Sequence, residues 1–103
     1  MVERQLQASV VRWLNEQPET LARVNGPGPA HVVGDPDVYG CTGGVMFQIE
    51  LKVGKNKPTA LQLQRLLDWE TAGAVTGVCT SLREVKALFE KAISPRVWGD
   101  PDW

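Results

Sequence analysis

Two short segments of the sequence carry residue types that can bind a metal ion. Gly34-Asp35-Pro36-Asp37 places a carboxylate in a turn, and Glu50-Leu51-Lys52 follows after twelve intervening residues. Residues 47–53 alternate apolar and polar, which is typical of a β-strand with one buried face, so the glutamate and the lysine point to the same side, roughly 7 Å apart. If Asp37 ends a neighbouring strand, two carboxylates and one amine converge. That arrangement suits a divalent cation that activates water against a phosphodiester.

Each segment also has an ordinary structural explanation. An alternating strand is common wherever one face of a sheet is solvated, and Asp-Pro-Asp is most often only a turn. Two further polar residues favour a site. Glu3 falls within the apolar stripe of the first predicted helix, where a carboxylate needs a partner, although it could also reach solvent and favour the helix dipole. Gln62 shares a helical stripe with Leu66 and Trp69, although Thr59-x-x-Gln62 is also a good capping box.

The composition is that of an ordinary globular protein. The chain has 103 residues, of which 43% are hydrophobic and 22% charged, and a formal net charge of −1. We expect a single domain over residues 1–95 and a short tail over residues 96–103. No run approaches the ~20 apolar residues of a membrane span, and Cys41 and Cys79 have no metal-ligand spacing. We therefore expect a cytoplasmic protein with reduced cysteines and no membrane segment.

The distribution of charge is more informative than its sum. Lys52, Lys55 and Lys57 fall within six residues directly after the acidic strand, so they form either a basic lip for nucleic acid or a solvated lysine-rich turn. The only histidine, His31, is either an incidental loop residue or a DNA contact. With a single histidine, the arrangements of serine, cysteine and zinc hydrolases lack their partners.

The pattern of apolar residues predicts an α/β fold. We expect the following elements in order: a helix over 2–15, strands over 21–25, 33–39 and 45–53, a helix over 59–72, a strand over 74–80, and a helix that begins with the capping box at 81–84. The first three strands can form an antiparallel meander. The helix over 59–72 then makes a right-handed crossover that lays the fourth strand parallel to the third. A mixed sheet with helices on both faces follows.

Taken together, the motifs resemble those of a known nuclease family. Glu3, Gly34-x-Pro36-Asp37, Glu50-Leu51-Lys52 and Thr59-x-x-Gln62 occur in the order found in PD-(D/E)xK nucleases, and most resemble the small standalone VRR-NUC domains of bacteria and phages. The resemblance covers about residues 2 to 80 and implies a restriction-endonuclease-like αβββαβ core. The Asp/Glu-x-Lys triad alone is permissive, but the additional motifs make the resemblance more specific.

The resemblance also implies a role for each residue of the motifs. Asp37, Glu50 and the backbone carbonyl of Leu51 would hold Mg²⁺ or Mn²⁺, and Glu3 would complete the acidic cluster directly or through water. Lys52 would orient or help deprotonate the attacking water. Gln62 would contact Lys52, water or phosphate. The candidate residues for binding the DNA are Asn25, His31, Lys55 and Lys57.

The function implied is metal-dependent, structure-selective DNA endonuclease activity, similar to that of Holliday-junction resolvases, which act as homodimers on four-way junctions. Trp98 and Trp103 could dock on a second copy or fold back on their own sheet. Two other interpretations stay open: a catalytically idle nucleic-acid-binding or assembly subunit with the same fold, and an unrelated small α/β interaction protein.

Overall fold

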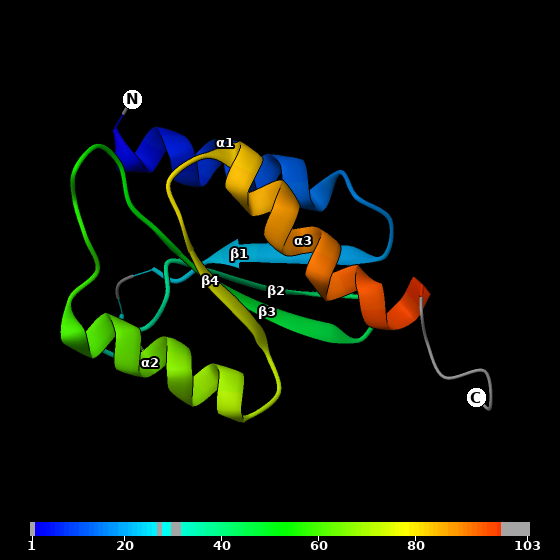
Figure 1. Cartoon of the computed structure of the whole chain (residues 1–103). Helices are drawn as coiled ribbons and strands as arrows, with labels where there is room; N and C mark the ends of the chain where they lie inside the picture. The colour runs from blue at the N-terminus through cyan, green and yellow to red at the C-terminus, as the bar shows by residue number, and fades with distance from the viewer. Residues whose placement is uncertain (1, 27, 30–31, 98–103) are drawn as a thin grey trace.

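The computed structural model describes residues 2–26, 28–29 and 32–97, with side chains as far as Ala92. Three helices and four strands follow one another along the chain (Figure 1). In order they are α1 (Glu3–Asn15), β1 (Thr20–Val24), β2 (Val38–Thr42), β3 (Val45–Leu51), α2 (Ala60–Thr71), β4 (Val75–Cys79) and α3 (Leu82–Val97). The predicted order of elements is therefore confirmed.

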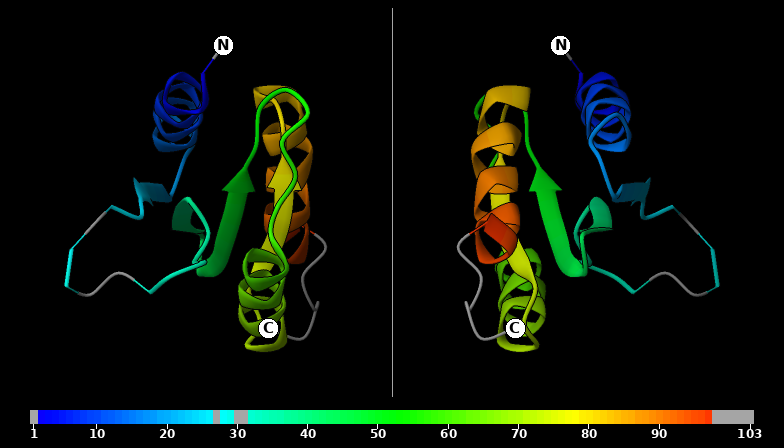
Figure 2. Two further views of the ribbon diagram at one scale, coloured as in Figure 1. Left: turned by 90° about the vertical axis from the view of Figure 1, so that its left-hand side faces the viewer. Right: turned by 90° about the vertical axis from the view of Figure 1, so that its right-hand side faces the viewer.

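The four strands form one mixed sheet in the order β1-β2-β3-β4. The first three strands are antiparallel, and β4 pairs parallel to β3 after the crossover through α2. This is the predicted topology. In Figures 1 and 2, α1 and α2 lie on opposite sides of the sheet.

The alternation of β3 decides which side chains reach each helix. Phe47, Ile49 and Leu51 are buried in the main core, which α1 and α3 complete with Leu6, Val10, Leu14, Val85 and Leu88. Gln48 and Glu50 therefore point to the other face, where α2 packs against β3 and β4. None of the described helices is long and apolar enough to cross a membrane.

The second strand begins later than its sequence predicts. The strand expected over 33–39 is Val38–Thr42, because Gly34 has a φ of +86° and Pro36 has no N–H to donate to a ladder. A turn forms instead, in which the Asp35 N–H donates to the Val32 carbonyl at 3.0 Å. Asp37 therefore precedes β2 and does not end a strand.

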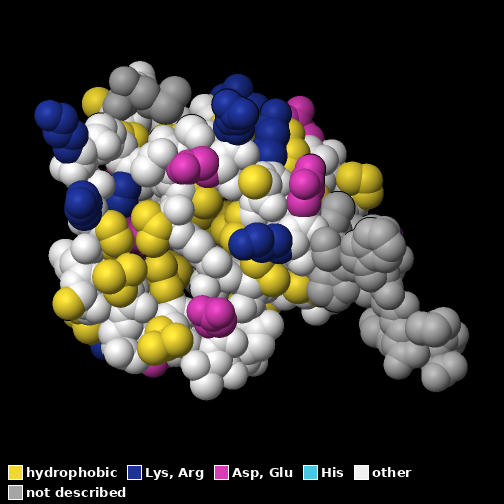
Figure 3. Space-filling model, viewed as in Figure 1, with side chains coloured by type: hydrophobic (Ala, Val, Ile, Leu, Met, Phe, Trp, Pro, Cys, Tyr) yellow, Lys and Arg dark blue, Asp and Glu magenta, His cyan; other side chains and the backbone are white. Residues whose placement is uncertain are grey.

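The second helix packs less deeply than predicted. The apolar pattern of residues 59–72 predicts that four residues face inward: Leu63, Leu66, Leu67 and Trp69. Leu66 is buried and Trp69 is half-buried, but Leu63 and Leu67 are 49% and 53% exposed. One helix above the β3–β4 edge can bury only a narrow stripe, so the flanking leucines stay at the surface. Figure 3 shows hydrophobic side chains gathered over α2.

The last helix extends beyond the predicted end of the domain. α3 continues to Val97, because a proline such as Pro95 removes one helical hydrogen bond without always ending the helix. The apolar pattern predicts five inward residues in this helix: Leu82, Val85, Leu88, Phe89 and Ala92. Three of them, Val85, Leu88 and Ala92, are buried, and the other two are partly buried against the core. Trp98 and Trp103, and with them the predicted docking of the tail, lie outside the described residues.

Candidate metal and nucleic-acid site

The loop before β2 holds Asp37 beside the end of β3. Val38 pairs with Ile49, so the antiparallel register continued by one residue places Asp37 opposite Glu50. Asn25 fixes this loop from β1: its side-chain amide donates to the Pro36 carbonyl at 2.7 Å, and its backbone N–H donates to the Asp37 carbonyl at 2.8 Å. Asn25, a predicted DNA contact, is thus a residue that positions Asp37.

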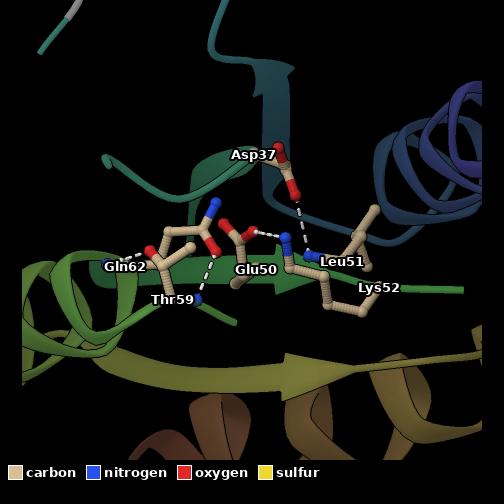
Figure 4. A network of polar contacts seen from close by, with 6 residues as sticks. All are labelled: Asp37, Glu50, Leu51, Lys52, Thr59 and Gln62. Atoms are coloured by element: carbon tan, nitrogen blue, oxygen red, sulfur yellow. Dashed lines mark hydrogen bonds and ion pairs between the residues drawn. The ribbon is translucent and has the colours of Figure 1, made fainter. Parts of the chain in front are cut away.

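The Asp37 carboxylate is oriented by the backbone of β3. Its Oδ2 accepts a hydrogen bond of 2.9 Å from the Leu51 N–H (Figure 4). Leu51 was predicted to contribute its carbonyl to a metal ion, and the group that contacts Asp37 is its N–H. The carbonyl's role as a ligand stays a prediction.

Glu50 is a buried carboxylate with little compensation. Glu50 is 1% exposed. Its Oε2 forms an ion pair with the Nζ of Lys52 at a distance of 3.3 Å. Among the described residues, no group is placed to form a hydrogen bond with either carboxylate oxygen. Burial, followed by the negative charge of Asp37, raises the pKa of Glu50 from 4.5 to about 7, and Lys52 only partly offsets this rise.

This pair of carboxylates fits a hard divalent cation. Such cations take oxygen ligands, and the Glu50 carboxylate, which accepts no hydrogen bond from the described residues and has Lys52 as its ion-pair partner, lies beside Asp37, a second acidic group. A cation would replace the missing hydrogen bonds and offset the repulsion between the two carboxylates. The residues present therefore suit Mg²⁺ or Mn²⁺, with Asp37 and Glu50 as the protein's charged ligands.

Gln62 begins α2 close to the same edge of the sheet. Its Oε1 accepts from the Thr59 N–H at 2.9 Å, and its own N–H donates to Thr59 Oγ1 at 3.1 Å, so the capping box is confirmed. Figure 4 shows the side-chain amide of Gln62 on the same side of β3 as Glu50. Because Oε1 serves the cap, only the amide N–H₂ is left to contact water or phosphate.

The remaining predicted residues lie farther from the acid pair or outside the description. Glu3 opens α1 and is half-buried, but among the described residues no three acidic, histidine or cysteine side chains are grouped to hold one metal ion. Its part in an acidic cluster stays a prediction. Lys55 and Lys57 are exposed in the loop after β3, as a basic lip requires. His31 lies outside the described residues.

Gln48 is a further polar residue of this region, and the sequence motifs did not identify it as part of the candidate site. Gln48 is 2% exposed, and its Oε1 has no hydrogen-bond partner in the described part of the chain. It shares a face of β3 with Glu50, two residues away. The alternation of the strand placed it there, but nothing in the sequence signalled that this face would be buried at Gln48.

Two solved structures share this architecture. One, described as a "VRR_NUC domain protein", aligns with a TM-score of 0.73 and 19% identity over 91% of this chain and 89% of that chain. Another, described as a "VRR_NUC domain", has a TM-score of 0.69 and 24% identity over 85% and 94%, respectively. No family model and no curated protein matches the sequence. The chain thus has the VRR_NUC fold that its motifs predicted.

The raised pKa of Glu50 predicts how stability depends on pH in metal-free buffer. In the folded state Glu50 keeps its proton up to about pH 7, whereas in the unfolded state it loses the proton near pH 4.5. The free energy of unfolding therefore decreases as the pH rises from about 4.5 to about 7 and beyond. Because one pKa unit corresponds to about 1.4 kcal/mol, the loss by pH 8 is on the order of 3 kcal/mol. Glu50→Gln should therefore be more stable than wild type at pH 8, and this advantage should vanish near pH 4.

Urea denaturation at several pH values measures this difference. Glu16→Gln, which removes an exposed carboxylate after α1, is the control and should follow the wild-type profile. A Glu50→Gln profile parallel to wild type from pH 4 to 8 would contradict the electrostatic account of the site.

Proposed function

We propose that this protein is a metal-dependent DNA endonuclease that hydrolyses phosphodiester bonds. The observation that carries the proposal is the buried Glu50 carboxylate, which lies beside Asp37 and has, among the described residues, the Lys52 ammonium at 3.3 Å as its compensation. The VRR_NUC fold supports it, although a fold alone does not define an activity. Acid ligands beside an amine are the groups needed to bind a cation and to act on water and phosphate.

Each side chain has a role that its surroundings favour. Asp37 and Glu50 would hold Mg²⁺ or Mn²⁺, which supplies Lewis-acid stabilisation of charge on the phosphate and lowers the pKa of water. The Lys52 ammonium, 15% exposed, is near enough to the site to orient water and contact a phosphate oxygen. Gln62 would contribute its amide N–H₂ to water or phosphate, and Lys55 and Lys57 would contact the DNA backbone.

The acid pair also discriminates between this function and a catalytically idle binding subunit. A carboxylate of raised pKa that lacks donors destabilises the folded protein, and a subunit that only binds DNA gains nothing from it. An anionic cluster would also repel phosphates unless a cation neutralised it. The site therefore favours a nuclease over the idle subunit.

Cleavage assays on defined DNA substrates test the proposal. The purified protein should cut a four-way junction or another branched DNA in Mg²⁺ or Mn²⁺, and EDTA should abolish cutting. Asp37→Asn removes one acidic ligand, so it should lose at least about a hundredfold in rate while remaining folded. Flap, single-stranded and linear duplex DNA in the same assay define the selectivity. Absence of metal-dependent cutting on all of these substrates would refute the proposed activity.

The lysine has a different expected phenotype from the carboxylates. Lys52→Ala should lose most cleavage activity but still bind Mn²⁺, because an ammonium has no lone pair to donate to a metal ion. Calorimetric titration of Mn²⁺ into the variant, next to Glu50→Gln, measures this directly. Loss of Mn²⁺ binding in Lys52→Ala would show that the lysine is needed to form the metal site.

A homodimer would suit a substrate that needs two symmetric cuts, because a two-fold axis supplies two identical sites of opposite polarity. We propose that the exposed apolar side chains of α2 and the adjoining turn form its interface: Val32, Val33, Leu61, Leu63 and Leu67. A patch of this kind on a small protein indicates a contact surface. It leaves the acid pair free for DNA.

Sedimentation velocity at micromolar concentration tests this assembly. Replacing Leu63 and Leu67 together by Ser should shift the protein towards monomer and lower junction cleavage, whereas Val2→Ser, at a residue 60% exposed on α1, should change neither. A monomeric wild type would exclude a pre-formed dimer and leave assembly on DNA as the remaining route to paired cuts.

A further inference from the structure

The acid pair is continuous with a second feature of the same sheet face. The strand register aligns Arg23, Tyr39 and Gln48 as the first of two cross-strand rows. Two residues along each strand, the next row consists of Leu21, Cys41 and Met46. The first row lies two residues from the acid pair on both segments: Tyr39 follows Asp37, which precedes β2, and Gln48 precedes Glu50, a spacing of roughly 7 Å along an extended chain. The acid pair, the first row and the second row therefore follow one another along this face of the sheet.

This part of the sheet contains an open hollow of about 270 Å³. Its lining comes entirely from the three antiparallel strands: Leu21, Arg23, Tyr39, Gly40, Cys41 and Met46. Figure 2 shows α2 next to β3 and β4 and away from β1, so no described helix lies over the hollow. We call it the β1–β2 hollow.

The chemistry of the β1–β2 hollow is unusual for a solvent-facing sheet. Leu21 is 56% exposed and Tyr39 is half-buried. Arg23 is an exposed residue of the edge strand; its Nη1 donates to the Ala22 carbonyl at 2.9 Å, and the other N–H groups of the guanidinium can contact a ligand. An aromatic ring with aliphatic neighbours gives a flat surface on which a base can stack, and a guanidinium pairs with phosphate. The buried Gln48 Oε1, for which no donor is found among the described residues, belongs to the first row, which lies between the second row and Glu50.

We propose that the β1–β2 hollow binds an unpaired nucleotide of the DNA strand that is cut, next to the scissile phosphate. Its base stacks on Tyr39, and Arg23 contacts the adjoining phosphate. This inference rests on the proposed nuclease function and specifies its substrate: a base inside a fully paired duplex is stacked on its neighbours and does not reach the ring. Branched or single-stranded DNA, which presents unpaired bases, is therefore preferred over linear duplex.

A DNA strand fits the hollow better than a second copy of the chain. Tyr39, which lines the hollow, is two residues from Asp37, so a strand held at the acid pair would reach the hollow within about one nucleotide. Arg23 complements a phosphate, whereas in a contact between two copies it would be buried against an apolar row. The proposed dimer surface consists of other residues, those of α2 and the adjoining turn, none of which lines the hollow.

An abasic scan tests the proposal without altering the protein. Wild type is titrated by fluorescence anisotropy, in EDTA and at low salt, with labelled single-stranded oligonucleotides that lack one base at successive positions. Removal of the base next to the cleavage position should weaken binding about tenfold, because stacking of one base on an aromatic side chain has an effect of this order. Neighbouring positions should change the affinity less.

Variants assign the effect to named residues. Tyr39→Ala should bind the intact oligonucleotide about tenfold more weakly and should be insensitive to the abasic position, whereas Tyr39→Phe should behave as wild type. Arg23→Gln should reduce the slope of log K against log salt by about 0.7, the change expected for one lost phosphate contact on a single strand. Arg83→Gln, an exposed arginine of α3, is the charge-matched control and should keep the wild-type slope.

The outcomes separate this inference from the nuclease proposal. The proposal that the hollow binds a nucleotide is overturned, and the nuclease proposal is not, by either of two results. One is a wild type that cuts DNA but binds every abasic oligonucleotide with the same affinity, and the other is a Tyr39→Ala variant that binds DNA as tightly as wild type. A Tyr39→Ala variant with unchanged DNA affinity but a lower dimer content identifies the face as a contact between copies, which also overturns it. A wild type that neither binds nor cuts any DNA overturns both proposals.

Discussion

The burial of one carboxylate, Glu50, is the constraint on which the rest of this structure depends. The alternation of β3 sends Phe47, Ile49 and Leu51 into the core, and it thereby forces Glu50 under the face that α2 covers. A buried carboxylate that Lys52 only partly compensates favours its neutral form, and the pKa of about 7 reflects this. A bound cation would remove that cost, which is the physical reason for proposing a metal site here.

The elements around Glu50 use ordinary structural devices to place their side chains. Asn25 holds the Pro36 carbonyl and the Asp37 backbone, and Leu51 directs the Asp37 carboxylate towards β3. The capping box of α2 uses the Gln62 oxygen and leaves its amide nitrogen at the site. Asn25, Leu51 and Thr59 therefore hold the loop of Asp37, its carboxylate and the side chain of Gln62 in place by ordinary hydrogen bonds.

The sequence predicted the order of elements, the strand pairing and the acidic pair because these depend on local periodicity and motif spacing. It misplaced the start of β2, because the turn at Gly34 depends on a positive φ and on contact with Leu61 of α2, a long-range feature. It overstated the burial of Leu63 and Leu67, because periodicity identifies an apolar face but not how much of it a neighbour covers. The unpartnered oxygens of Gln48 and Glu50 are tertiary properties that no local pattern contains.

The most direct test of the account is whether a divalent cation stabilises the fold through Glu50. Thermal unfolding at pH 7.5 is compared with and without MgCl₂ for wild type, Glu50→Gln and Glu16→Gln. A ligand that binds only the folded state raises Tm as its concentration increases. The account predicts a rise for wild type and Glu16→Gln and none for Glu50→Gln. An equal rise in all three proteins, or no rise in wild type, would contradict a metal site at Glu50.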